Sequence, residues 1–260
     1  MPLKIIDQLS QDIMDKLSAF NHVAFLQHRA NTDGNSLILK LPKLRGTEPT
    51  EEWSDITVAK LAADVDAVAL FLTDQLKDSV APRSVVSVWS VFAYILCVAC
   101  LKSSPRFPGY DYDHLVYVLA LTRASYIPQM FCESLANSGI VFELMEKAGS
   151  KAIIYDNVYE SLMTDCPFPK IPLLPIAACL EVRGDSLPSV DCLSWTDEDI
   201  CFILHTSGST SGSPKLVPAT GKYLKVLTKK HIVAYSLEAK SRDAFLGRGC
   251  VCHVPSIIRR

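Results

Sequence analysis

One segment of the chain concentrates residue types that bind anions. Residues 197–217 read DEDICFILHTSGSTSGSPKLV, an acidic turn at 197–199 followed by the apolar run CFIL. Residues 206–213 are all Thr, Ser or Gly, and Pro214 and Lys215 follow them. A strand that opens into such a loop presents hydroxyls and backbone N–H groups to an anion, because glycine lets the main chain form a concave nest. Lys215 adds a positive charge for phosphate oxygens. The segment therefore predicts a cradle for a polyphosphate.

The loop differs from a Walker A phosphate loop, because Ser213 and Pro214 separate Gly212 from Lys215 and the GK[ST] ending is missing. A flexible Ser/Gly linker is the alternative interpretation, but it does not explain the apolar run before the loop or the Pro-Lys after it. His205 borders the loop and is expected at a strand end near the ligand rather than as a base. Neither a Ser-His-Asp order nor a G-x-S-x-G elbow appears, so hydrolase chemistry has no support and no catalytic residue is assigned.

The cysteines indicate reduced thiols rather than a disulfide scaffold or a metal site. Nine cysteines are scattered over 260 residues, too sparsely for a disulfide scaffold. A secretory signal is not predicted either, because Asp7, Asp12 and Asp15 lie where such a signal needs an apolar stretch. Cys97-x-x-Cys100 and Cys250-x-Cys252-His253 each lack the ligands that complete a four-coordinate zinc site. We therefore expect a cytoplasmic protein and assign no metal ligands.

The composition is that of a globular domain. Hydrophobic residues make up 49% of the chain and charged residues 21%, which excludes a disordered or low-complexity protein. The formal net charge is −2, so no basic excess exists to neutralise a nucleic-acid backbone. Nucleic acid is therefore not expected as a partner.

Helical and strand patterns alternate along the sequence that precedes the loop. A helix is predicted from an N-cap at Ser54 onward, because apolar residues recur on one face, at Leu61, Val65, Val68 and Leu72. Two further helices are predicted at 113–124 and 137–149. Short apolar runs at 84–88, 126–131, 151–156 and 201–204 indicate strands. Loops are expected at 31–36 and 41–53, and the five prolines of 166–189 indicate a connecting loop. This order predicts an α/β fold, a mostly parallel sheet with helices on both faces. Lys222, Lys225, Lys229 and Lys230 are expected on the solvated face of a helix after the loop.

One uncharged run supports an alternative in which the protein is anchored in a membrane. Residues 84–101 read SVVSVWSVFAYILCVACL between Arg83 and Lys102, about the minimum of ~18 residues for a spanning helix. The first five residues also fit a buried parallel strand, which is likewise continuously apolar. The strand interpretation is favoured, because the run sits at the lower limit and the sequence offers no second span.

The loop HTSGSTSGSPK resembles the phosphate-binding signature of the adenylate-forming, AMP-binding superfamily, whose usual form is T-S-G-[ST]-T-G-x-P-K. The superfamily includes acyl-CoA synthetases, adenylation domains of nonribosomal peptide synthetases and luciferases. Ser211 makes the loop one residue longer, which resembles the fungal synthetase-like branch, and Leu216 replaces a common glycine. The matching residues are Thr206, Ser207, Gly208, Ser209, Thr210, Gly212 and Lys215.

The resemblance extends less specifically over residues 53–215. It implies a partial AMP-binding domain at 53–260, after an N-terminal extension at 1–52. Residues 89–108 interrupt the family pattern between a strand and a helix, and they resemble an insertion. His253, in CVCHVP, resembles only vaguely the histidine that often starts the family's acyl-pocket motif.

The resemblance implies ATP-dependent activation of a small carboxylic acid, with ATP or AMP and Mg²⁺ as cofactors. It also implies that CoA, a carrier domain or a reductase receives the activated acyl group. In the family pattern, the motifs for adenine, for ribose and for the catalytic lysine come so far after the loop that they are expected beyond residue 260. The resemblance therefore implies an amino-terminal part of such a domain, and a non-catalytic nucleotide-binding remnant is the alternative. It identifies no particular acid.

Overall fold

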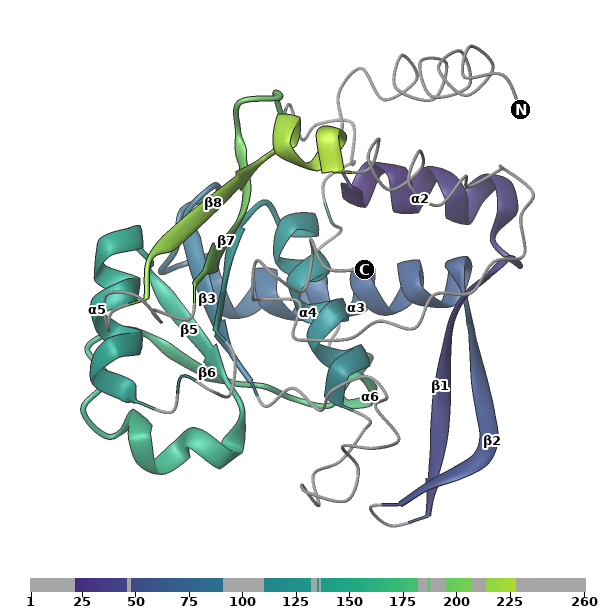
Figure 1. Ribbon diagram of the computed structural model, residues 1–260, viewed down its shortest axis with the longest axis horizontal. Coiled ribbons are helices and arrows are strands. Elements are labelled where there is room, and N and C mark those ends of the chain that lie inside the picture. Colours follow the sequence, from purple (N-terminus) through teal and green to yellow (C-terminus); the bar gives the residue numbers. More distant parts are fainter. Residues whose placement is uncertain are drawn as a thin grey trace.

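The computed structural model describes residues 22–45, 48–90, 110–131, 135, 137–181, 187, 195–206 and 214–227. These residues form a six-stranded sheet with helices against it and a separate two-stranded ribbon (Figure 1).

The main sheet is mostly parallel. Its strands lie in the order β6-β5-β3-β4-β7-β8, and only β8 runs antiparallel to its neighbour. The strands are β3 (Val85–Trp89), β4 (Ile127–Phe131), β5 (Ala152–Tyr155), β6 (Lys170–Pro172), β7 (Ile200–His205) and β8 (Leu216–Thr220). The three central strands, β5, β3 and β4, are buried almost throughout, as expected where both faces of a parallel sheet are covered. The predicted α/β class is confirmed.

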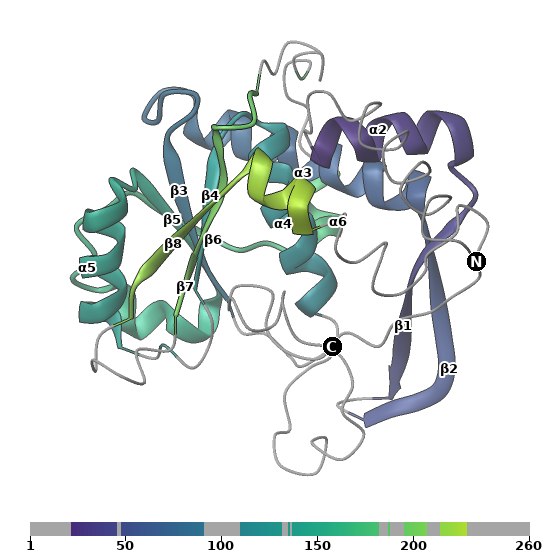
Figure 2. The same cartoon turned by 45° about the horizontal axis from the view of Figure 1, so that its top comes forward.

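Helices cover both faces of the sheet. One face packs against α3 (Val58–Leu76) and α4 (Tyr110–Arg123), and the other against α5 (Ser138–Ala148) and the 3₁₀ helix η1 (Asn157–Met163) (Figures 1 and 2). The helix α5 begins at the Asn137 N-cap and ends at Gly149, whose φ of 68° is the left-handed conformation that favours glycine. Both ends agree with the predicted helix at 137–149.

The central strand β3 divides the core into two clusters, because alternate side chains of a strand point to opposite faces. Val86 and Val88 join the cluster formed with α3 and α4, whereas Trp89 joins the cluster formed with α5 and η1. The Trp89 indole stacks on the Tyr159 ring with centroids 4.1 Å apart. This strand therefore ties the two halves of the core together.

The predicted start of α3 is wrong. Thr57, not Ser54, is the N-cap, and its hydroxyl accepts a hydrogen bond from the Lys60 N–H. Ser54 lies in β2 (Glu48–Thr57) and pairs with Leu41 of β1 (Leu37–Arg45). Strand pairing therefore uses the backbone that the local capping signal would have placed in a helix.

The segment before α3 is more ordered than the two predicted loops. The helix α2 (His22–Asp33) packs along α3, and β1 and β2 form an antiparallel ribbon that extends away from the main sheet (Figure 1). Leu39 and Leu41 of the ribbon pack against the α3–α4 core. The expected loop at 41–53 is thus largely strand. Residues 1–21 of the predicted extension lie outside the described residues.

Residues 166–189 are not a plain connecting loop. Residues 170–172 form β6, which pairs in parallel with β5, and a short helix α6 (Ile176–Cys179) follows it. The prolines occupy places that tolerate them: Pro172 ends the edge strand, and Pro175 precedes the first turn of α6.

The apolar run at 84–101 begins in the middle of the main sheet. Residues 85–89 are strand β3, hydrogen-bonded on both sides to β4 and β5. Trp89, the first residue of the predicted insertion at 89–108, is the buried last residue of β3, and Ser90 after it is buried as well. Residues 91–101 of the apolar run and residues 91–108 of the predicted insertion lie outside the described residues. Among the described residues, no helix is both long and apolar enough to cross a bilayer.

Candidate functional site

The strand β7 carries the chain to the carboxyl edge of the parallel sheet. Its apolar residues are buried alternately and then continuously, and its parallel pairing aligns Ile203 with Gln129 of β4. Phe131 and His205 consequently end the two strands at the same edge, with ring centroids 6.0 Å apart. Ligands of open parallel sheets bind outside the carboxyl ends of the strands. The predicted phosphate loop starts at this edge.

Thr206 and Lys215 close the root of the loop. They lie opposite each other, one position closer to the loop than the last pair of the β7–β8 ladder, His205 with Leu216. The Thr206 N–H donates to the Lys215 carbonyl oxygen at 2.9 Å, and the Lys215 N–H donates to the Thr206 Oγ1 at 3.0 Å. The structure therefore brings together the first and last of the predicted site residues. The others, Ser207, Gly208, Ser209, Thr210 and Gly212, lie outside the described residues and stay predictions.

His205 is a strand-end residue next to the loop root. It is buried, and its Nδ1 lies 3.1 Å from the Thr206 carbonyl oxygen. This position agrees with the expectation from the sequence. Pro214 is also buried, whereas Lys215 is exposed, so the charged side chain stands at the surface of the loop root.

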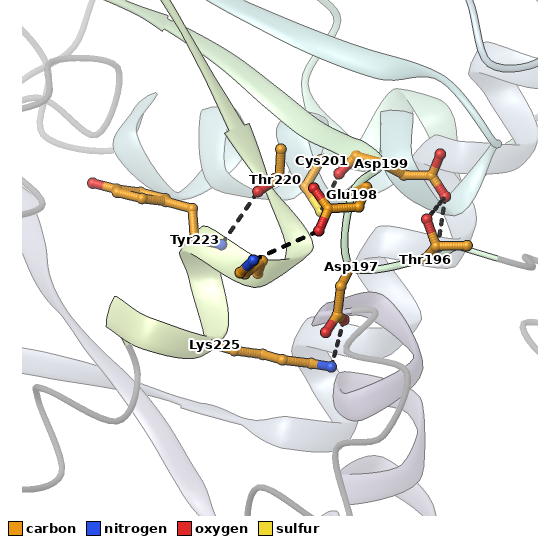
Figure 3. A network of polar contacts seen from close by, with 9 residues as sticks. Thr196, Asp197, Glu198, Asp199, Cys201, Thr220, Tyr223 and Lys225 are labelled. Atoms are coloured by element: carbon orange, nitrogen blue, oxygen red, sulfur yellow. Dashed lines mark hydrogen bonds and ion pairs between the residues drawn. The ribbon is translucent and has the colours of Figure 1, made fainter.

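A polar network holds the other end of the β7–β8 hairpin (Figure 3). Asp197, before β7, forms an ion pair with Lys225 of the helical turns at 221–227 that follow β8. The carbonyl of Asp197 also accepts a hydrogen bond from the Lys222 N–H at 2.8 Å, and that of Asp199 accepts one from the Gly221 N–H at 3.1 Å. Main-chain and side-chain contacts together therefore fasten the base of the hairpin.

The acidic turn predicted at 197–199 is held by hydrogen bonds and packs against the start of the helical turns at 221–227. Asp199 Oδ2 accepts hydrogen bonds from the Thr196 N–H and hydroxyl, and these bonds lower the pKa of the Asp199 carboxyl. Gly221 packs directly on this turn, because an added Cβ would come within 3.1 Å of the Thr196 carbonyl oxygen. The sequence showed the acidic turn but no signal for the residues that contact it from the far side of the hairpin.

The predicted solvated lysine face is wrong in one position. The Lys225 side chain is only 11% exposed, because it turns toward Asp197. Lys222 remains 69% exposed and lies 3.8 Å from Glu198. Lys229 and Lys230 lie outside the described residues.

Other parts of the described chain offer little ligand chemistry. No group of three or more His, Cys, Asp or Glu among the described residues could hold a metal ion, and Cys97, Cys100, Cys250, Cys252 and His253 lie outside them. A depression of about 500 Å³ lies between α5 and Phe168, lined by Phe142, Glu143 and Glu146 among others. None of its lining residues belongs to the loop root. The loop root at the β7–β8 hairpin therefore stays the candidate site that the sequence predicts.

The chain is similar to one curated protein over nearly its whole length. It is 44% identical over 254 residues to the AMP-binding domain-containing enzyme iboA of Amanita muscaria (strain Koide BX008). The alignment covers 95% of this chain and 45% of that enzyme, so the chain spans about half the length of the relative. No family model matches the chain.

Solved structures of adenylate-forming ligases share the fold. A double mutant of o-succinylbenzoate CoA synthetase from Bacillus subtilis, bound with a product analogue, superposes with a TM-score of 0.60 at 14% identity, covering 84% of this chain and 37% of that one. The same synthetase with ATP and a magnesium ion gives 0.57 at 13% identity, covering 82% and 47%. A fatty acyl-adenylate ligase from L. pneumophila, in complex with acyl adenylate and pyrophosphate, gives 0.57 at 16% identity, covering 84% and 33%.

Proposed function

Because the chain belongs to the AMP-binding, adenylate-forming family, we propose that it binds the outer phosphates of ATP in the ATP-dependent activation of a carboxylic acid. Residues 206–215 would form the phosphate site. The observation that carries the proposal is the root of this loop, where Thr206 and Lys215 are joined by two hydrogen bonds at the carboxyl edge of a parallel sheet.

The residues at the root fit a phosphate group. The Thr206 hydroxyl accepts one hydrogen bond from the Lys215 N–H and still has its own proton to donate. The Lys215 ammonium is exposed and positively charged, and it can contact phosphate oxygens without leaving a buried position. Hydrogen bonds and a charge of this kind suit an anion that carries several negative oxygens.

In the proposed reaction, a carboxylate oxygen attacks the α-phosphorus of ATP, and the bond from that phosphorus to the bridging oxygen breaks. The leaving pyrophosphate takes the electron pair of that bond. Lys215 and the hydroxyl and N–H donors of the loop would stabilise the charge that grows on the pyrophosphate. Mg²⁺ would enter with the nucleotide, on the phosphate oxygens, and neutralise part of their charge.

The remaining assignments follow from family membership. We propose a small carboxylic acid as the substrate and CoA or a carrier domain as the acceptor of the acyl group. We also propose that the chain acts in the cytoplasm; its three described cysteines, Cys166, Cys179 and Cys201, are free thiols, as a reducing compartment maintains. A partial AMP-binding domain at 53–260, after an extension at 1–52, remains our proposal for the domain organisation.

Titration of the 260-residue chain with Mg²⁺–ATP, AMP and pyrophosphate tests the phosphate site. The Lys215→Ala variant should weaken ATP and pyrophosphate but not AMP, because the lysine addresses the outer phosphates. Loss of a charged hydrogen bond costs about 1.5–3 kcal/mol, roughly a factor of ten to a hundred in affinity.

Lys222→Ala is the matched control, since Lys222 is an exposed lysine at the opposite end of the same hairpin. It should leave all three affinities unchanged. An equal loss for ATP and AMP in Lys215→Ala would contradict the assignment. ATP binding without any acid-dependent chemistry in a longer chain would favour the non-catalytic remnant.

A further inference from the structure

The way the β7–β8 ladder ends points to a second task for Thr206. In a hydrogen-bonded antiparallel pair, each residue donates its N–H to the carbonyl of the other. Thr206 donates its N–H to the Lys215 carbonyl oxygen at 2.9 Å, as the pattern requires. The reciprocal bond is different, because the Lys215 N–H donates to the Thr206 Oγ1 at 3.0 Å instead of the Thr206 carbonyl oxygen.

The Thr206 carbonyl has another neighbour. Its oxygen lies 3.1 Å from Nδ1 of the buried His205 ring, a distance at which a protonated Nδ1 donates a hydrogen bond. The main chain therefore turns out of the ladder at Thr206, and the side-chain hydroxyl takes the place of the carbonyl as partner of Lys215.

We propose that Thr206 is a positioning residue. Its hydroxyl holds the main chain of Lys215 at the loop root and thereby places the Lys215 ammonium group for the outer phosphates. The inference rests on the proposed function of the loop. A hydroxyl can accept from the Lys215 N–H and donate its proton to a phosphate oxygen at the same time. Phosphate contact and the placement of Lys215 are thus coupled through one side chain.

Two variants separate the hydroxyl from the shape of the side chain. Thr206→Val keeps the branched shape and removes the hydroxyl, whereas Thr206→Ser keeps the hydroxyl. Thr220→Val is the matched control, because Thr220 ends β8 at the base of the same hairpin and its hydroxyl accepts from the Tyr223 N–H at 3.3 Å. All are made in the 260-residue chain.

The first measurement is hydrogen exchange of the Lys215 amide by NMR, without nucleotide. Thr206→Val should speed this exchange by about fivefold, because a hydrogen bond worth about 1 kcal/mol is lost. Thr206→Ser and Thr220→Val should leave it near the wild-type rate. An unchanged Lys215 exchange rate in Thr206→Val overturns the positioning role, whether or not nucleotide binds.

The second measurement is binding of Mg²⁺–ATP and AMP. Thr206→Val should weaken ATP by roughly threefold to tenfold and AMP much less, and Thr206→Ser should restore ATP. In a Lys215→Ala background, Thr206→Val should cost less ATP affinity than it does in the wild type, because the part of its effect that acts through Lys215 is already lost. Independent, multiplying losses would show that Thr206 is only a phosphate ligand. Absence of ATP binding in the wild type would refute the proposed function, and the exchange measurement would still decide the contact.

Discussion

Asp113, at the start of α4, shows how a single half-buried carboxyl can influence stability. Burial and, secondarily, the neighbouring Asp64 raise its pKa to about 6, while Lys60 opposes them. Asp64 is itself almost fully buried, and it accepts hydrogen bonds from Tyr112 at 2.6 Å and from Lys60 at 2.5 Å. The protonated form of Asp113 is therefore favoured in the folded chain.

We predict that Asp113→Asn removes a pH-dependent loss of stability. Between about pH 4 and pH 6 the folded state keeps a proton that the unfolded chain has released, so the free energy of unfolding falls as the pH rises through this range. The variant should be more stable than the wild type at pH 7, by about 1 kcal/mol after allowing for solvent screening, and similar near pH 4.

Urea unfolding at pH 4 and pH 7 provides the measurement. Asp78→Asn, an exposed carboxyl after α3, controls for the removal of a charge elsewhere. Parallel pH dependences of the wild type and Asp113→Asn would show that this carboxyl is not perturbed by its neighbours.

At the scale of elements, the β7–β8 hairpin has a fastened base and a loop at its tip. The ion pair of Lys225 with Asp197 lies at the base, and its lysine is nearly buried while its carboxylate is 43% exposed (Figure 3). Lys225→Met keeps the apolar stem and removes the charge. We predict that this variant lowers the free energy of unfolding by about 1 kcal/mol, and no more, because solvent screens the partly exposed Asp197 carboxylate.

Urea unfolding followed by tryptophan fluorescence measures this loss. Lys222→Met is the control, because Lys222 and Glu198 are 69% and 78% exposed and lie 3.8 Å apart, so their removal should change stability by less than about 0.5 kcal/mol. Equal effects of the two variants would mean that burial of Lys225 adds nothing to the hairpin.

A residue just before the segment 91–109 and a residue in the first turns of α4 after it are linked inside the fold. Ser90 Oγ lies 2.6 Å from Nδ1 of His114, and both side chains are buried. Burial lowers the pKa of His114 to about 3, so the ring that meets the serine hydroxyl is neutral at physiological pH. The chain therefore leaves β3 and enters α4 at nearly the same place, which supports the proposal of an insertion.

We predict that residues 91–108 can be removed without loss of the fold. A variant that joins Ser90 to Gly109 through a short Gly-Ser linker should unfold as cooperatively as the full chain and be more soluble, because a long apolar run is absent. Excision from residue 89 onward is the matched comparison. It also deletes the buried Trp89, and loss of such a side chain costs about 3–5 kcal/mol.

Circular dichroism melting and size-exclusion chromatography compare the two excised proteins with the full chain. The first should fold and the second should be strongly destabilised. If the excision that keeps Trp89 and Ser90 is unfolded while the full chain is folded, the segment belongs to the core of the domain.

For the whole molecule, we predict that the 260-residue chain alone does not form acyl-adenylates. The chain spans 45% of its curated relative, and the phosphate loop at 206–215 is the part of the nucleotide site that we propose for it. Groups that position the adenine, ribose and carboxylate can contribute factors as large as ~10⁵–10⁸ in effective molarity. Exchange of pyrophosphate into ATP, assayed with aryl, fatty and amino acids, should therefore stay at background.

A chain extended to the length of the relative is the positive control for this assay. Acid-dependent exchange by the 260-residue chain itself would mean that its own residues complete the site. Exchange by neither protein would point to the nucleotide-binding remnant.

Local signals in the sequence determined much of the architecture. The spacing of Leu61, Val65, Val68 and Leu72 placed one face of α3 in the core, where all four are buried. The helix predicted at 137–149 agrees with α5, whose ends are set by Asn137 and Gly149, because capping bonds join residues only a few positions apart. The apolar run before the Thr/Ser/Gly segment likewise indicated β7 and the start of the phosphate loop.

The tertiary structure decided whatever depends on partners distant in the chain. Ser54 has a capping residue's chemistry but pairs with Leu41 in a strand, and the three residues of β6 form a strand only because β5 lies beside them. The contact of Lys215 with the Thr206 hydroxyl needs the chain reversal between β7 and β8. Hydrogen bonds across a sheet form between segments that no local pattern brings together, so strand pairing and the geometry of the loop root emerge only in the folded chain.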